Sequence, residues 1–127
     1  MTKKNKQLLL VDLCARLPYK VVCRKDAKTV DGESFYLDEY PSAIELTKYL
    51  NCDIEINIKP YLRPMNSMTE EEVEKYYNIV DDPNAVENFE RLNLTLLDWL
   101  NKHHFDYRGL IEKGLAIEAK EGIYNVK

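Results

Sequence analysis

The clearest hydrophobic pattern in the chain predicts one amphipathic helix over residues 85–104. At about 100° per residue, its apolar side chains share one face, with His103 and His104 at the end of that face. Two start signals compete. Either Asp82 caps the helix and Pro83 takes the first position, or Asn84 caps it and Glu87 completes a capping box. The pattern predicts a helix with a wide stripe against a core.

The chain after this helix predicts a corner and a second, short helix over residues 107–113. Asp106 is placed to cap it, and Gly114 to end it in the left-handed conformation. Two helices meeting at such a corner would bury Trp99, Phe105 and Tyr107 together. A short strand over residues 115–117 follows.

In the first half of the chain, the apolar positions predict one helix followed by a small antiparallel meander. Residues 4–17 form an apolar helical face that includes Cys14, and Pro18 ends it. Strands are expected over 21–24, 29–30 and 34–37, with a turn at 26–28 and a hairpin at Asp31-Gly32.

The middle of the chain holds one ambiguous and several clear patterns. Residues 42–50 fit a helix capped by Ser42 or a strand, and the helix is favoured; residues 52–58 alternate as a strand. Two prolines keep residues 59–68 extended and argue against a central strand or a helix there. Thr69 and Glu72 form a capping box that opens a further helix, with apolar positions at Val73, Tyr76, Tyr77 and Val80.

Length and composition indicate a single domain spanning residues 1–127. With 45% apolar and 31% charged residues the chain has an ordinary globular composition. The expected fold class is α+β: an N-terminal helix, a small antiparallel sheet of three to five strands over about residues 20–58, then two or three helices packed on it. No apolar run is long enough for a signal or a membrane span, and three unpaired cysteines fit a reducing cytoplasm.

Two histidines beside a carboxylate are the first candidate site. His103, His104 and Asp106 could bind a metal or act as acid and base. Adjacent helical residues diverge by about 100°, however, and no second cluster of His or Cys supplies further ligands. The expectation is therefore a structural role, with no metal, no cofactor and no catalytic residue. A small hydrolase or metal enzyme using His104 and Asp106 stays as an alternative.

The proline-stiffened loop and the corner form the second candidate, a surface for a protein partner. Aromatic, cationic and thioether side chains of the kinds enriched at interfaces gather there, and a stiff loop loses less entropy on binding. The competing interpretation packs the loop onto the sheet, with Arg63 in an ion pair. The expected partner-binding residues are Tyr61, Arg63, Met65, His104, Tyr107 and Arg108.

Nucleic-acid binding and cysteine catalysis are less favoured. The net charge is −4, and phosphate contacts need clustered Lys and Arg. A nucleic-acid accessory protein would require Lys3, Lys4, Lys6, Arg24 and Lys25 to converge on one face, and Arg63 and Arg108 could join them. Cys14 and Cys23 both lie in apolar patterns and are expected in the core.

Two blocks, residues 59–72 and residues 99–114, resemble a family of small uncharacterised proteins encoded by gut bacteria and by their phages or integrated elements. The blocks cover about a quarter of the chain. The resemblance implies a bacterial or phage cytoplasmic protein and supplies no activity. The leading hypothesis is a non-enzymatic interaction module that binds through residues 59–68 and the 103–108 corner.

Overall fold

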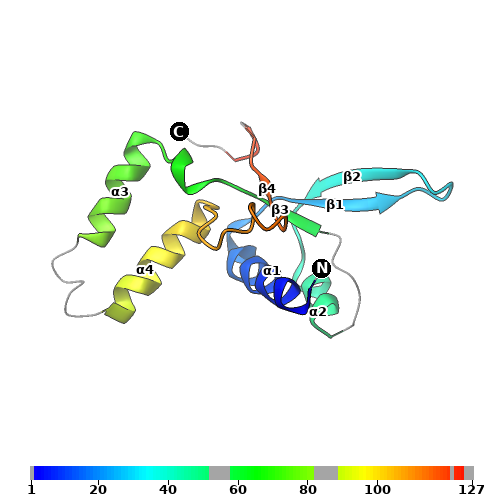
Figure 1. The fold of residues 1–127 in the computed structure, drawn as a ribbon, viewed down its shortest axis with the longest axis horizontal. Coiled ribbons are helices and arrows are strands. Elements are labelled where there is room, and N and C mark those ends of the chain that lie inside the picture. The colour runs from blue at the N-terminus through cyan, green and yellow to red at the C-terminus, as the bar shows by residue number, and fades with distance from the viewer. Residues whose placement is uncertain (1, 52–57, 82–88, 121, 125–127) are drawn as a thin grey trace.

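The computed structural model describes residues 2–51, 58–81, 89–120 and 122–124. It confirms the α+β class (Figure 1). The elements in chain order are α1 (Lys3–Arg16), the 3-10 turn η1 (Leu17–Tyr19), β1 (Cys23–Lys28), β2 (Ser34–Glu39), α2 (Ala43–Asn51), β3 (Ile58–Leu62), the 3-10 turn η2 (Met65–Ser67), α3 (Glu70–Val80), α4 (Phe89–Lys102) and β4 (Ile117–Glu118). The expected strand over residues 52–58 falls mostly outside the described residues, although Ile58 begins β3.

The sheet has the strand order β2-β1-β3-β4 and is mixed. β1 is antiparallel to both of its neighbours, as the meander prediction requires, but β3 and β4 run parallel. The prediction of a purely antiparallel sheet ending near residue 58 is therefore wrong. The chain passes through α3 and α4 between β3 and β4, and this long connection allows a parallel return.

β3 corrects the expectation that residues 59–68 contain no central strand. Pro60 lies in β3, opposite Cys23 of β1. The next residue, Tyr61, donates its N–H to the Val22 carbonyl of the β1 side at 2.9 Å. Successive residues of a strand direct their backbone groups to opposite sides, so the Pro60 nitrogen faces β4, where pairing begins only at Tyr61. No ladder hydrogen bond is lost at this proline.

The β1–β2 hairpin is longer than predicted. Asp26, Ala27 and Lys28 continue β1, so the predicted turn at 26–28 is wrong. The turn lies at Asp31-Gly32, as predicted, where Gly32 has φ +87° and donates to the Thr29 carbonyl at 3.0 Å. In Figure 1 the paired strands project well beyond the helices.

Among the described residues, two hydrophobic clusters form the core. The larger joins α1 and α2 to one side of the sheet through Leu9, Leu13, Leu46, Ile58 and Leu62. The smaller contains Trp99, Leu100 and Phe105 of α4 and the corner, with Tyr76 and Tyr107 packed against it. This confirms the predicted nucleus at the corner. Cys23 is buried as expected, but Cys14 is exposed, because it lies at the margin of the α1 stripe.

α2 and α3 begin at their predicted capping residues. Ser42 Oγ accepts the Glu45 N–H at 3.1 Å, so the helix was the right choice for residues 42–50. Thr69 and Glu72 form both halves of the predicted capping box of α3. α4 ends at Lys102 rather than 104, and its predicted start signals lie outside the described residues.

The corner after α4 replaces the predicted 107–113 helix with turns. The Asp106 carboxylate accepts the N–H groups of Leu110 at 2.8 Å and Ile111 at 3.0 Å, beyond the positions that a helix N-cap serves. Gly114 has φ +72° as predicted. The Leu115 N–H donates to the Leu110 carbonyl, which forms a Schellman closure.

Candidate functional site

Arg63 and its neighbours link the end of β3 to the corner. Arg63 is 7% exposed, and its guanidinium lies 4.3 Å from the Phe105 ring centroid. It donates to both carboxylate oxygens of Glu72. Its backbone N–H donates to the His104 carbonyl, and its carbonyl accepts the Asp106 N–H, both at 2.8 Å. Arg63 is therefore engaged inside the protein, as the competing interpretation of the loop expected.

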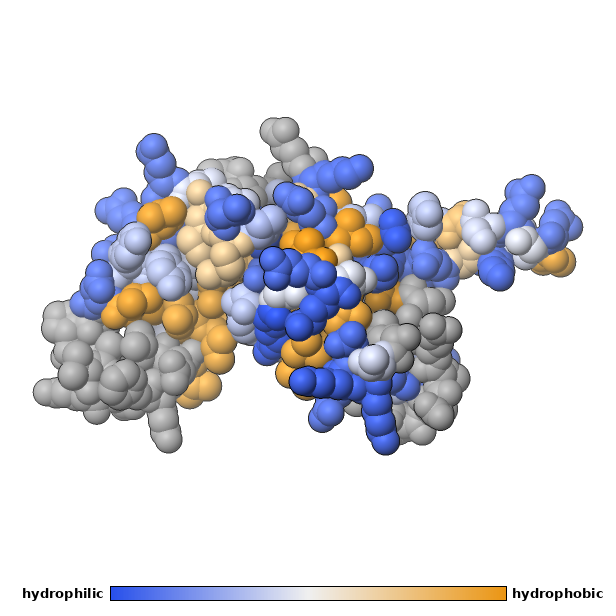
Figure 2. All heavy atoms as spheres, in the orientation of Figure 1, coloured by the Kyte–Doolittle hydropathy of each residue, from blue (hydrophilic) through white to orange (hydrophobic). Residues whose placement is uncertain are grey.

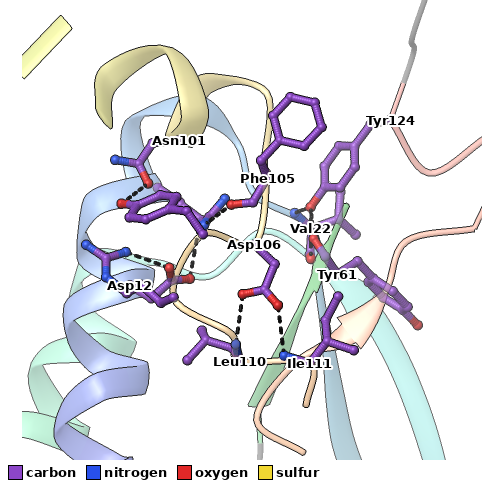
Figure 3. A network of polar contacts seen from close by, with 12 residues as sticks. Asp12, Val22, Tyr61, Asn101, Phe105, Asp106, Leu110, Ile111 and Tyr124 are labelled. Atoms are coloured by element: carbon purple, nitrogen blue, oxygen red, sulfur yellow. Dashed lines mark hydrogen bonds and ion pairs between the residues drawn. The ribbon is translucent and has the colours of Figure 1, made fainter. Parts of the chain in front are cut away.

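A second buried arginine, Arg16, anchors the corner to α1. Figure 3 labels its partner Asp12. Asp12 and Arg16 are both 0% exposed and are joined at 2.9 Å. Arg16 also donates to the Phe105 carbonyl at 2.5 Å. The other oxygen of Asp12 accepts from Arg108 at 2.6 Å. Both guanidinium groups lie over the Tyr107 ring, 5.4 Å (Arg16) and 4.6 Å (Arg108) from its centroid, and the Tyr107 hydroxyl donates to Asn101 at 2.8 Å.

His104 does not meet Asp106 in a polar site. It has φ +60° because it fills the left-handed position that closes α4, where Phe105 N–H returns to the Leu100 carbonyl. Its ring stacks on Tyr124 at 4.1 Å between centroids, whereas His103 packs beside Trp99. Burial, together with the nearby Arg16 charge, lowers the pKa of His104 to about 4. The imidazole is therefore neutral at pH 7.

Tyr124, near the C-terminus, bridges the β1 and β3 backbones with its hydroxyl group. Its hydroxyl accepts the Val22 N–H at 2.9 Å and donates to the Tyr61 carbonyl at 2.7 Å. Val22 and Tyr61 are partners across β1 and β3, so the hydroxyl replaces the second direct bond of that pair. Figure 3 shows the tyrosine reaching between the two backbones.

The six residues expected to bind a partner therefore do not share one exposed surface. Tyr61, Arg63 and His104 are buried. Met65 is exposed, and Tyr107 and Arg108 are partly exposed. Burial of the 59–63 segment within the sheet argues against that surface. Two basic residues that could join a nucleic-acid surface, Arg63 and Arg108, are held in ion pairs with Glu72 and Asp12.

The most exposed apolar segment of the sheet is β2. Phe35, Tyr36, Leu37 and the following Tyr40 are all exposed, with Tyr36 at 65%. β2 is the first strand in the sheet order, and no strand of the described residues pairs with its outer edge. Figure 2 shows the hairpin as a narrow arm projecting from the body, carrying both hydrophobic and hydrophilic residues.

The register identifies the backbone groups on the outer edge of β2. Thr29 donates to the Glu33 carbonyl at 2.8 Å, and this pairing continues as Ala27 with Phe35 and Lys25 with Leu37. Backbone groups alternate between the two sides of a strand. The N–H and C=O groups of Ser34, Tyr36 and Asp38 therefore point away from β1, toward solvent.

Side-chain contacts hold the hairpin in place. The Arg24 guanidinium lies 4.4 Å from the Tyr36 ring centroid, and the Tyr61 hydroxyl donates to Asp38 at 2.8 Å. Burial, followed by this hydrogen bond to Asp38, raises the pKa of Tyr61. Lys25 forms an ion pair with Glu45 of α2 at 2.6 Å. β2 is thus attached to β1 and β3, and β1 is attached to α2, while the outer edge of β2 stays open.

An apolar stripe on α3 is a weaker candidate. Val73, Tyr77 and Val80 are exposed although their spacing predicted a core face. Tyr76 and Ile79 pack on the smaller hydrophobic cluster instead. The face of α3 that meets α4 is therefore rotated from the predicted one, and nothing in the described residues identifies what would cover the remaining stripe.

No protein-family model, curated protein or solved structure matches this chain. The described residues contain no group of three or more His, Cys, Asp or Glu side chains placed to hold a metal. Within the same residues, no helix combines the length and hydrophobicity of a membrane span.

The sequence predicts a strand at residues 34–37 but not that it lies at the edge of the sheet, because the place of a strand in a sheet depends on pairing with distant residues. One local feature does point to an unprotected strand. Phe35-Tyr36-Leu37 contains no charge and no proline, the residues that usually protect an edge strand.

Proposed function

We propose that this chain is a non-enzymatic protein-interaction module that binds an extended segment of its partner along the outer edge of β2. The observation that carries the proposal is the open edge itself. Outward backbone groups at Ser34, Tyr36 and Asp38 run beside the exposed side chains of Phe35 and Leu37. An added strand gains affinity from main-chain hydrogen bonds and specificity from alternate side chains.

The preformed hairpin favours this mode of binding. Arg24 and Tyr61 already hold β2 through their contacts with Tyr36 and Asp38. Lys25 of β1 pairs with Glu39 of β2 and ties the hairpin to α2 through Glu45. A rigid edge needs less ordering when a partner binds. Natural edge strands are usually shielded by charges, prolines or bulges, and the centre of β2 has no charge or proline.

The proposal keeps the predicted class of function and moves its surface. Tyr61 supports the new site, since its hydroxyl holds Asp38 of β2. Arg63 and His104 organise the corner from inside. Met65, Tyr107 and Arg108 lie outside the β2 edge.

Site-specific photo-crosslinking tests the proposal. A benzophenone amino acid would replace Tyr36 in the full chain, expressed in the cells that naturally produce it. The matched control places the same group at Ile44, which is 73% exposed on α2. We expect one defined protein adduct from position 36 that is missing from position 44. Circular dichroism would establish that both variants are folded.

Three results would count against the proposed function. The same adducts from both positions would indicate unspecific contact. Failure to form a protein adduct at position 36, in cells where the chain is expressed and folded, would argue against the edge as the binding surface. Adducts removed by nuclease would favour the nucleic-acid alternative.

A further inference from the structure

Charge is divided across the hairpin. The turn and β2 carry only acidic charges, at Asp31, Glu33, Asp38 and Glu39. The basic residues of the hairpin lie on the inner strand, where Arg24 stacks on Tyr36 and Lys25 pairs with Glu45 at 2.6 Å and Glu39 at 3.7 Å. The outer edge therefore presents an apolar centre with acidic ends.

The acidic and apolar side chains of this edge alternate in a regular way. Successive side chains of a strand point to opposite faces, so Glu33, Phe35, Leu37 and Glu39 share one face. An added strand places its own side chains directly opposite these positions. Apolar residues would then meet Phe35 and Leu37, and cations would meet the two glutamates.

We infer that the partner is a segment of another protein with the seven-residue pattern basic-x-apolar-x-apolar-x-basic, bound as an added strand on β2. This inference rests on the proposed function and names its ligand class. The acidic positions flank the apolar pair on both sides, so the pattern is the same in a parallel and in an antiparallel added strand. The charges therefore determine which side chains the partner carries, and leave the direction of its strand open.

A second copy of the chain does not satisfy the same edge. An antiparallel β2–β2 pair centred on Tyr36 places Glu33 opposite Glu39 of the other copy, twice. Other registers form no ion pair either, because β2 contains no Lys or Arg. Like charges directly opposite each other destabilise a strand pair.

A peptide experiment on the full chain tests the charge pattern. The probe is a fluorescent, terminally blocked heptapeptide with lysine at positions one and seven, valine at three and five and threonine at the others. The control replaces both lysines with glutamate. By fluorescence anisotropy in low salt, we expect at least about tenfold tighter binding of the lysine peptide, weakened by added salt. Glu33→Gln with Glu39→Gln should reduce the difference between peptides several-fold.

Backbone substitution and amide exchange locate the bound strand. Ser34→Pro removes an outward N–H, whereas Ser34→Ala keeps it, so only the first should weaken binding. On binding, the amides of Ser34, Tyr36 and Asp38 should become protected from hydrogen exchange. Those of Phe35 and Leu37, which face β1, should change little.

The outcomes separate this inference from the proposed function. Equal binding of both peptides, with protection at residues 34, 36 and 38, would overturn the charge pattern and leave the binding edge intact. Lack of binding by the lysine peptide would overturn the inference, and the Tyr36 crosslink would then decide the function independently. Sedimentation could instead show that the chain is a dimer. If the same amides are protected in that dimer, a second copy occupies the edge, and the inference is overturned as well.

Discussion

Arg63 and Glu72 form a two-point ion pair inside the protein, with nitrogen–oxygen distances of 2.7 and 2.6 Å. Burial raises the pKa of Glu72, but hydrogen bonds from Arg63 and Thr69 outweigh it, so the net pKa is lowered. The pair joins the residue after β3 to the first turn of α3. It fixes where the third helix begins relative to the sheet.

Arg63→Met should lower the free energy of unfolding by about 3–5 kcal/mol, because Glu72 would remain buried without its cation. Urea denaturation followed by Trp99 fluorescence would measure the loss. Adding Glu72→Gln, which keeps a group able to accept the Thr69 N–H, should recover part of it. Strictly additive losses in the double variant would contradict a direct coupling.

Stability should fall as the pH is lowered from about 6.5 toward 4, partly through His104. Its folded pKa of about 4 lies below the ordinary value of 6.5, so the unfolded chain takes up the proton first. The full contribution is present above pH 6.5 and is lost as the pH falls through this window, by about 3 kcal/mol at most. Denaturation midpoints across pH 4–7.5 would measure it.

His104→Asn is the matched variant for this titration, since asparagine tolerates the left-handed backbone and carries no proton in this range. The slope of stability against pH between 6.5 and 4 should become shallower than in the parent. An unchanged slope would mean that other groups, such as His103, account for it.

Tyr124→Phe should destabilise the protein by about 2 kcal/mol. The change removes only the hydroxyl, which leaves the Val22 N–H and the Tyr61 carbonyl without their bridge. Thermal unfolding would give the loss, with Tyr40→Phe as the control because Tyr40 is 62% exposed. Equal effects of the two changes would argue against the bridge.

The described cysteines should differ sharply in reactivity. Cys14 is exposed, whereas Cys23 is buried and its pKa is raised first by desolvation. In a Cys52→Ser background, a thiol reagent at pH 8 should modify one group rapidly and the second only on unfolding. Mass spectrometry would assign the sites, and rapid modification of Cys23 would contradict the buried strand.

Local patterns predicted the local structure well. The capping box at Thr69 and Glu72, the Asp31-Gly32 turn and the left-handed Gly114 all appear as expected. Each depends on residues within a few positions of one another. The aromatic nucleus around Trp99 and Phe105 was also predictable, because the helix stripe and the corner are adjacent in the sequence.

The site depended on distant contacts and was not predictable in the same way. Pro60 fits a central strand only because β4 begins to pair one residue later. Arg63 and His104 carried interface-like chemistry, yet Glu72 and Tyr124 hold them inside. The open edge of β2 depends on which strands pair elsewhere, and a hydrophobic pattern does not record that.

The carboxylate of Asp12 is shared by two cations from very different parts of the chain, Arg16 and Arg108. Loss of Asp12 would leave both guanidinium groups without their shared anion, and loss of either arginine would remove one of the two cations that compensate the buried carboxylate. Natural variants should therefore change these three positions together or not at all. If diverged versions of this chain are compared, correlated substitution at 12, 16 and 108 would be the evolutionary trace of one buried charge cluster.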